Sequence, residues 1–453
     1  MTVADRAEVR ARFLWGRLRT DEAAEWMFKV ALLLTVPVMY VIGRHQWFIR
    51  DDWAFIVTRN QIRTQVGVSD WLFLPTAGHW MTVPLLIYRL VQQLFGIDSY
   101  WPFLIINMAI HICVVVSVRA LCRRIGVRPW TTTLVCGGLL VFGAGWENIV
   151  FAIQVTCGLS LLAFFVQLLL VDHDGPPDHR DAIGSVGAVI GVMSSGFGPF
   201  FLVGASCLLV LRRRWTALAI AAIPQALALA WWWLFWGRDS PEPSTGGSAA
   251  LVPAYAVRGI IASFEGLIGV PGLGSLAAVA ALGAALWRGP GWRVQSMLLT
   301  LWITAGAMFL GIGTQRVAFG IENAAISRYQ YMGAMLLASA FALAVDQVRK
   351  VSIEAGWVMR TSLLVALVLS LGSLRTNSSE WAIRARDEQR TLELIAGSGL
   401  AGQADPSHQP LPFSPDLRVG TIAMLVDEGA VVPRVPATPE EIALVRTALG
   451  LAP

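Results

Sequence analysis

The chain has 453 residues, of which 55% are hydrophobic and 14% are charged, and its formal net charge is +5. Soluble domains carry about 25% charged residues. This shortfall, with a mean hydropathy of +0.60, excludes a soluble globular enzyme, a disordered chain and a nucleic-acid binder. The five cysteines lie in apolar stretches without a CxxC pair, so neither a disulfide framework nor a zinc site is predicted. We predict an all-α polytopic membrane protein.

The first apolar stretch begins only after residues 1–27, which are polar or mixed. It is not followed by the small-residue cleavage site that ends a secretory signal peptide. We therefore predict a cytoplasmic N-terminal segment, 1–27, followed by an uncleaved signal anchor.

Stretches of about 20 apolar residues predict transmembrane helices. The clear candidates are residues 28–43, 101–121, 131–149, 151–171, 216–236, 271–287, 294–313, 329–346 and 357–374. A weaker pair, 183–193 and 197–211, is interrupted by glycine and proline between Met193 and Pro199. With that pair we predict about eleven crossings. Such short helices are tolerated at membrane depth only inside protein or beside a water-filled cavity.

Lys and Arg concentrate in the segments on the N-terminal side of the membrane. The short loops of the opposite side contain only Arg238, Arg258, Arg316 and Arg328. Because cytoplasmic loops are rich in Lys and Arg, we predict a cell-membrane protein with its N-terminus cytoplasmic and its C-terminus extracytoplasmic. Residues 251–270 are expected to form an interfacial helix on the outer side; if they crossed the membrane, every later span would be inverted.

A long outer loop, 44–100, separates the first two spans. It contains two amphipathic segments, Trp53 to Val66 and Trp80 to Gly96, with polar and apolar residues on different faces. Amphipathic helices of this kind lie in the membrane interface. A structured loop in that position suits an enzyme that acts on a lipid-linked substrate at the membrane surface.

Two adjacent carboxylates, Asp51 and Asp52, open this loop. Mutual repulsion and partial burial would raise the pKa of at least one. One is therefore a candidate general base, and the other an orienting or metal-binding group. A divalent metal such as Mg²⁺, Mn²⁺ or Ca²⁺ would fit, because carboxylates and phosphate are hard oxygen ligands. The alternative is a solvated acidic turn that caps a helix starting near Trp53.

His79 ends a turn, Pro75 to His79, directly before the second amphipathic segment. It is a candidate substrate-binding residue if it faces the same cavity as the acidic pair. The alternative is a histidine at a helix start whose hydrogen bonds are satisfied within the protein.

Together these features resemble the GT-C class of membrane glycosyltransferases, over about residues 28–375. The resemblance rests on the signal anchor, the acidic pair opening the outer loop, the two interfacial helices and the turn at His79. The stretch from Gly143 to Gln154 also resembles one that follows the third span in actinobacterial members. The resemblance implies a polyprenyl-phosphate-linked sugar as donor, a glycan, lipid or protein of the cell envelope as acceptor, and Asp51 or Asp52 as general base.

A second similarity lies before the span 329–346, where Arg328 and Tyr329 are adjacent. An Arg-Tyr pair in that place resembles the donor-phosphate contacts of GT-C enzymes, and a guanidinium fork matches phosphate oxygens. Arg316 lies in the same loop and is a further candidate substrate-binding residue. The alternative is an interfacial anchor, since Arg and Tyr are common at the membrane boundary.

Residues 376–453 are too few for a large carbohydrate-binding domain and are expected to form a small, mainly helical outer appendage. Thr438, Pro439 and Glu441 form a helix-start pattern within it.

Two further patterns are given structural interpretations. The His- and Asp-containing stretch 172–181 is interpreted as a solvated loop rather than a metal site. The glycines of 397–402 are interpreted as a linker rather than a dinucleotide motif.

The rival functions are a transporter or lipid flippase, and a non-catalytic membrane scaffold. A transporter predicts broken helices in both halves, whereas the sequence shows one such pair.

Overall fold

The computed structural model describes residues 20–238, 240, 247–287, 289 and 291–452. All regular secondary structure of these residues is helical, which confirms the predicted all-α class. Residues 1–19 of the predicted N-terminal segment lie outside the described residues. The α-helices are α2 (Asp21–Gly43), α3 (Arg59–Gln65), α4 (Val68–Phe73), α5 (Thr82–Phe95), α6 (Trp101–Arg124), α7 (Pro129–Leu140), α8 (Glu147–Val150), α9 (Val155–Val171), α10 (His179–Val192), α11 (Gly198–Leu211), α12 (Trp215–Trp232), α13 (Val252–Ile268), α14 (Gly274–Leu286), α15 (Trp292–Arg316), α16 (Ser327–Val351), α17 (Ile353–Ser398), α18 (Ile422–Asp427) and α19 (Pro439–Ala448).

Eight helices of the described residues are long and apolar enough to cross a membrane, so the chain is a polytopic helical membrane protein. They differ in position within the bundle: the apolar stretch of α16 is 83% buried, whereas that of α2 is 22% buried. The exposed side chains of α2 include Leu33, Val36 and Tyr40, as expected of a helix that faces lipid. Helix α16 is instead the central helix of the bundle.

Small residues allow this central position. Gly333, Ala334, Ala338 and Ala342 of α16 are buried, and a Cβ at Gly333 would collide with Ser263 of α13. In a membrane, where lipid is as apolar as leucine, such close packing is a main source of helix association.

The predicted span 131–149 is wrong in its second half, because α7 ends at Leu140. The chain then continues through three short turns before α9, namely Gly143–Gly145, Glu147–Val150 and Ala152–Gln154. Glycine is required at the first turn, because a Cβ at Gly143 would collide with the α17 backbone at Ser370, and one at Gly145 with Tyr331 of α16. This close approach to two helices places the start of α8 beside the start of α16.

Residues 251–270 form a helix, α13, that is also long and apolar enough to span. Two of its polar side chains nevertheless contact the segment between α15 and α16: Arg258 pairs with Glu322 at 2.9 Å, and Tyr255 donates to Asn323 at 3.2 Å. The next helix, α14, starts against the middle of α13, where a Cβ at Gly274 would collide with the backbone of Ile261.

The last predicted span, 357–374, is part of a much longer helix. Helix α17 runs without interruption over 46 residues, because no proline or buried glycine break occurs between its apolar and polar halves. Its second half carries the C-terminal region, residues 399–452. The predicted helix start in that region is confirmed: α19 begins at Pro439, and the Thr438 hydroxyl accepts the Glu441 N–H.

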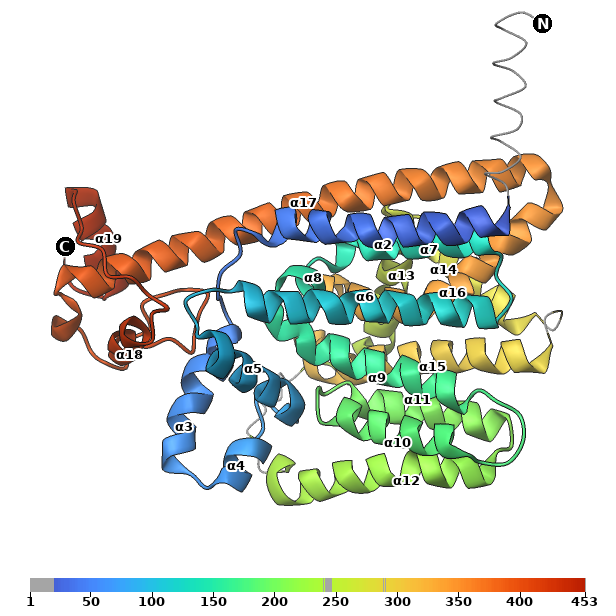
Figure 1. Cartoon of the computed structure of the whole chain (residues 1–453), viewed down its shortest axis with the longest axis horizontal. Coiled ribbons are helices and arrows are strands. Elements are labelled where there is room, and N and C mark those ends of the chain that lie inside the picture. Colours follow the sequence, from blue (N-terminus) through green and yellow to red (C-terminus); the bar gives the residue numbers. More distant parts are fainter. Residues whose placement is uncertain (1–19, 239, 241–246, 288, 290, 453) are drawn as a thin grey trace, which may run out of the picture.

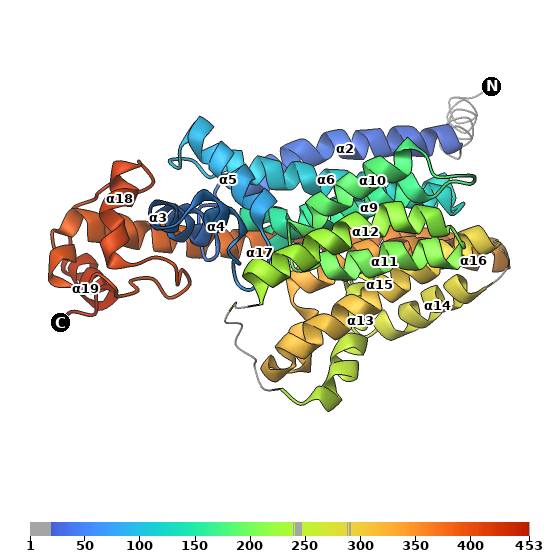
Figure 2. The ribbon, with the colours of Figure 1, turned by 90° about the horizontal axis from the view of Figure 1, so that it is seen from below.

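Figure 1 shows the first long loop and the C-terminal region at one end of the bundle, here named the distal end. The opposite end, where α2 starts and α17 begins, is named the proximal end. Figure 2 shows the same arrangement from below, with α18 and α19 beyond α3 and α4. Hydrogen bonds join the two distal parts, from the Arg50 N–H to Ser414 at 3.0 Å and from Thr58 to Asp416 at 3.0 Å.

Candidate functional site

The two adjacent carboxylates at the distal end have different environments. Asp52 is fully buried, and both of its oxygens accept hydrogen bonds: Oδ1 from the Tyr88 hydroxyl at 2.6 Å, and Oδ2 from the Tyr100 hydroxyl at 3.1 Å and the Ile49 N–H at 3.3 Å. Burial raises the pKa of Asp52 to about 7, against the lowering effect of these bonds. Its carboxylate joins the loop to α5 and to the start of α6, and neither oxygen faces solvent.

Asp51, in contrast, is exposed. Its charge acts on the guanidinium of Arg328 and on the carboxyl group of Asp416. Burial raises the pKa of Asp416, and the neighbouring Asp51 charge raises it further. Of the acidic pair, Asp51 is therefore the member that offers a solvent-accessible carboxylate within electrostatic range of a cation.

That cation is anchored by a carboxylate that the sequence interpretation did not single out. Arg328, in the first turn of α16, bonds through Nε to Oε2 of Glu147 at 3.2 Å. The Ser327 hydroxyl accepts the N–H of Glu147 at 3.1 Å, so the starts of α8 and α16 are joined twice. The Arg328 side chain is 28% exposed. Within the described part of the chain, its two terminal nitrogens have no hydrogen-bond partner.

Tyr329 and Arg316 lie beside this pair. Tyr329 is 8% exposed and is within electrostatic range of both Arg328 and Arg316. Arg316, the last residue of α15, is exposed and lies over the Phe319 ring at 5.8 Å. The structure thus brings Asp51, Arg328, Tyr329 and Arg316 into one region.

His79 lies in a tight turn in which Thr76 and His79 exchange backbone hydrogen bonds of 3.0 Å. Ala77 and Gly78 have φ values of 48° and 74°, as a two-residue type I′ turn requires. The buried guanidinium of Arg59 holds the turn through Thr76 Oγ1, 3.1 Å from Arg59 Nε, and its burial lowers the Arg59 pKa to about 10.

The His79 ring packs against the segment between α10 and α11, where a Cβ at Gly196 would collide with Nδ1. The neighbouring Ser195 contacts the thiol of Cys157, which is in electrostatic range of Arg328. The segment between α10 and α11 thus contacts His79 through Gly196 and Cys157 through Ser195.

A buried hydrogen-bond chain connects the acidic loop to the segment that carries Glu147. The Tyr100 hydroxyl, which donates to Asp52, accepts the Ala152 N–H at 2.7 Å. Asn107 of α6 donates to the carbonyl oxygens of Asn148, Ile149 and Phe151 at 3.0–3.3 Å. These contacts satisfy the irregular backbone after α7 and fix the positions of Asp51 and Glu147 relative to α6.

Helix α17 and the C-terminal region form another side of this region. The ring of Trp381 packs against Trp146 and Phe151, with centroid distances of 5.2 and 5.3 Å, and Arg50 lies over it at 5.0 Å. The side chain of Arg50 is thereby directed to α17, while its backbone N–H bonds to Ser414.

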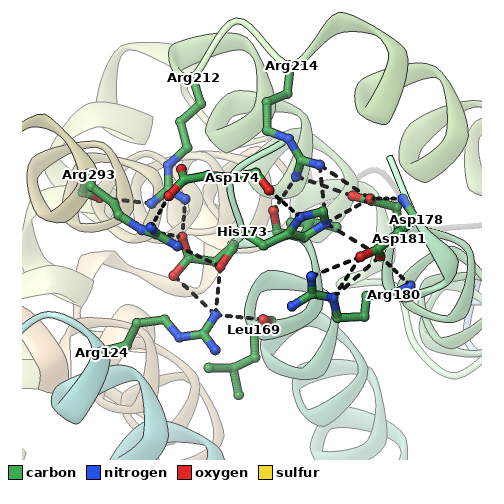
Figure 3. Close-up of polar contacts among 12 residues, drawn as sticks. Arg124, Leu169, His173, Asp174, Asp178, Arg180, Asp181, Arg212, Arg214 and Arg293 are labelled. Atoms are coloured by element: carbon green, nitrogen blue, oxygen red, sulfur yellow. Dashed lines mark hydrogen bonds and ion pairs between the residues drawn. The ribbon is translucent and has the colours of Figure 1, made fainter. Parts of the chain in front are cut away.

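The stretch 172–181, interpreted from the sequence as a solvated loop, is exposed in its middle but has three buried residues at the proximal end. Asp172 is 4% exposed, His173 7% and Asp181 0%. Figure 3 shows arginine side chains that converge on these residues: Arg124 from the end of α6, Arg212 and Arg214 from the turn between α11 and α12, and Arg293 from the start of α15. Asp172 pairs with Arg124 at 3.2 Å, with Arg293 at 3.4 Å and with Arg212. The solvated-loop interpretation therefore holds for residues 174–176 and 179–180, which are exposed. It does not hold for Asp172, His173 and Asp181, because guanidinium groups compensate the carboxylate charges and allow burial.

His173, Asp178 and Asp181 of this network have ligand atoms within 4.8 Å of one another, as a metal site would require. The guanidinium of Arg214 lies among them, 3.2 Å from His173 Nε2 and 3.3 Å from Asp181 Oδ1. A cation of the protein itself thus compensates these groups. Asp178 and Asp181 also form the capping box that starts α10, so the network is explained by structure.

Three participants in the distal region were missed by sequence reasoning: Glu147, Tyr100 and Trp381. Glu147 lies within the quoted stretch from Gly143 to Gln154, and a carboxylate in an apolar stretch was a usable signal. Tyr100 and Trp381 have no such signal, because aromatic residues at helix ends are usual in membrane proteins. Comparisons of the chain with protein families, curated proteins and solved structures found no significant match.

Proposed function

We propose that this protein is an integral-membrane glycosyltransferase that moves a sugar from a polyprenyl-phosphate donor to a cell-envelope acceptor. The proposal combines the resemblance to GT-C enzymes with the distal region around Asp51 and Arg328. The observation that carries it is an exposed carboxylate, Asp51, within electrostatic range of the Arg328 guanidinium, whose terminal nitrogens have no hydrogen-bond partner among the described residues.

Arg328 is the proposed phosphate-binding residue. A guanidinium offers parallel N–H donors that match two phosphate oxygens. Glu147 accepts a hydrogen bond from Nε of Arg328 and so orients the guanidinium group. The two terminal nitrogens remain able to donate to a ligand. Arg316 and Tyr329, in the same region, would add a second cation and a hydroxyl group.

Asp51 is the proposed general base. It accepts the proton of the acceptor hydroxyl, whose oxygen attacks the anomeric carbon. The bond from that carbon to the phosphate oxygen breaks, and the lipid phosphate leaves with its charge held by Arg328. Attack opposite the leaving group inverts the anomeric configuration. Asp52 positions the loop, because both of its oxygens are already bonded and it has no access to substrate.

A divalent metal fits this region only in part. Asp51 offers an exposed carboxylate and Glu147 a buried one, but the oxygens of Asp52 are occupied by Tyr88 and Tyr100. A bound Mg²⁺, Mn²⁺ or Ca²⁺ would supply further charge compensation for phosphate. The proposed steps use only Asp51 and Arg328.

We place the distal end outside the cell membrane and the proximal end in the cytoplasm, with about eleven crossings. In this arrangement α13 stays on the outer side, as its contacts with Glu322 and Asn323 favour, and α14 crosses. The variant Ser407→Cys should then react with a membrane-impermeant thiol reagent in intact cells. Labelling that requires permeabilised cells would place the C-terminal region inside.

Sugar transfer by the purified full chain tests the function. Polyprenyl-phosphate hexoses and pentoses are supplied as donors, and the release of polyprenyl phosphate is measured. Asp51→Asn should lower the rate about 10²–10⁴-fold, as loss of a general base does. Asp98→Asn is the matched control, since Asp98 is an exposed carboxylate at the same end of the bundle. Equal rates for Asp51→Asn and the control would remove Asp51 from the chemistry.

An absence of transfer with every donor, combined with donor-lipid translocation by the wild-type chain in vesicles, would favour the flippase alternative. Lipid binding without transfer or translocation would favour the scaffold alternative.

A further inference from the structure

A polar groove lies at the distal end, between the second half of α17 and the segment before α19, and its lining residues include neither Asp51 nor Arg328. Its volume is about 390 Å³, and its lining residues are Ile383, Arg386, Asp387, Gln389, Arg390, Glu393 and Arg434. Ligand sites typically measure about 300–1,000 Å³, so the groove has room for one or two sugar rings.

The spacing of the lining residues follows from the helix. Residues 383, 386, 387, 390 and 393 recur at intervals of three and four, so they share one face of α17. Arg434 comes from the opposite wall, where the chain lies directly on α17: the Arg434 N–H bonds to the Glu393 carbonyl at 2.9 Å. A Cβ at Gly397 would collide with the Arg434 backbone, so glycine permits this close approach.

Two guanidinium groups of the groove, those of Arg390 and Arg434, are positioned by a buried carboxylate. One oxygen of Glu441, Oε1, accepts from both Arg390 and Arg434 at 2.8 Å. The other oxygen, Oε2, accepts the Ala437 N–H at 2.8 Å. The Glu441 side chain is 8% exposed, whereas those of Arg390 and Arg434 are 55% and 49% exposed. A buried carboxylate thus fixes two exposed cations in place.

Each arginine of the groove keeps donors that face solvent. Arg390 and Arg434 each use one terminal nitrogen for Glu441, and Arg386 uses Nε for the Ala382 carbonyl at 3.2 Å. In the described ranges no other hydrogen bond is made by these three guanidinium groups. Preorganised donors lose little conformational entropy when a ligand binds, and guanidinium forks match carboxylate and phosphate oxygens.

The remaining polar groups add acceptors to these donors. Asp387 is exposed, and the Gln389 amide donates to Glu393 at 3.0 Å, which leaves the Gln389 carbonyl oxygen as an acceptor. Guanidinium groups recognise an anion, and carboxylate or amide oxygens accept from hydroxyl groups. A ligand that carries both an anionic group and hydroxyl groups fits this combination best.

We propose that the groove of Arg386, Arg390 and Arg434 binds an anionic carbohydrate, a sugar that bears a carboxylate or phosphate group. The site does not depend on the proposed transfer activity and is tested without any donor lipid.

The test is calorimetric titration of the detergent-solubilised full chain with glucuronic acid, glucose 1-phosphate, inorganic phosphate and glucose. Both anionic sugars, or one of them, should bind, and glucose should bind at least tenfold more weakly. Binding of glucuronic acid alone or of glucose 1-phosphate alone identifies the anionic group. Inorganic phosphate that binds as tightly as glucose 1-phosphate would overturn the carbohydrate assignment, and no binding of either anionic sugar would overturn the site.

Variants of two arginines test whether the anionic sugars bind in this groove. Arg434→Gln and Arg434→Lys should each weaken the anionic sugars at least tenfold, because neither retains the guanidinium fork. Arg434→Lys keeps the charge beside Glu441 and controls for folding, which is checked by thermal unfolding of each variant. Arg384→Gln is the matched control, since Arg384 is an exposed arginine of α17 that lies over Phe413 rather than in the groove. Equal loss in Arg384→Gln, or no loss in either Arg434 variant, would contradict the proposal.

Discussion

The two ends of the bundle each contain a cluster of arginines and carboxylates, but the clusters differ in how completely their groups are paired. At the proximal end Asp172 has three arginine partners, and Arg214 contacts both His173 and Asp181. At the distal end Arg328 pairs, among the described residues, with Glu147 alone, and Asp51 is exposed. The proximal network holds four helix ends together, whereas the distal groups retain hydrogen-bonding capacity for a ligand.

This difference shows that a high density of charged residues does not by itself locate a functional site. By residue type the proximal stretch is the stronger metal candidate, since it contains His173, Asp178 and Asp181. Buried ion pairs of this kind are costly to break and contribute to a specific arrangement of helices. The incompletely paired distal cluster is the better candidate for chemistry.

The largest expected effect concerns Asp172. Asp172→Asn leaves three guanidinium groups without their shared anion, and breaking a buried pair in this way costs about 3–5 kcal/mol. Unfolding of the detergent-solubilised protein by heat or denaturant measures the loss. Asp174→Asn is the matched control, because Asp174 is 87% exposed and its one ion pair among the described residues is with Arg293. An exposed pair is worth about 0–1 kcal/mol. Equal losses for the two variants would show that the proximal network does not stabilise the bundle.

The second effect is the pH dependence contributed by Asp52. Its folded pKa is about 7, above the ordinary 3.8, so between these values the folded state retains a proton that the unfolded state has lost. The free energy of unfolding therefore decreases as the pH rises through this window, by about 1.4 kcal/mol per pH unit for this group, or about 2–3 kcal/mol from pH 5 to pH 7.

The comparison of wild type with Asp52→Asn isolates this contribution, because asparagine does not titrate. The difference in unfolding free energy between the two proteins should change with pH from 5 to 7 and stay constant from 8 to 9. A difference that is constant over the whole range would mean that Asp52 titrates normally in the folded protein.

A smaller effect tests the contact of His79 with Gly196, which lies in the segment between α10 and α11. Gly196→Ala should cost about 1–2 kcal/mol, since the new Cβ collides with the His79 ring. Gly187→Ala in α10 has open space around its Cβ and should be neutral or stabilising. In the background of His79→Ala the cost of Gly196→Ala should largely disappear. If the cost persists there, the segment is constrained by something other than His79.

The sequence predicted the class of fold well, because long apolar stretches specify membrane helices by composition alone. The sequence did not predict the end of α7 at Leu140, because the chain leaves the helix where Gly143 and Gly145 closely approach two helices that are distant in sequence. The distinction between Asp51 and Asp52 also depends on long-range contacts, namely those of Tyr88 and Tyr100. The burial of Asp172 and Asp181 was not predicted for the same reason, because Arg124, Arg212, Arg214 and Arg293 lie far away in sequence. Local patterns therefore identified candidate groups, and tertiary contacts decided which of them are paired.

Binding of polyprenyl phosphate to the purified full chain tests the central claim most directly, because it requires the open fork of Arg328. Arg328→Lys should weaken binding about tenfold or more, since a point charge cannot replace two parallel donors. Arg293→Lys, an exchange in the proximal network, should leave the affinity unchanged. Equal affinity for wild type and Arg328→Lys, or an equal loss in Arg293→Lys, would contradict the assignment of the distal cluster as the ligand site.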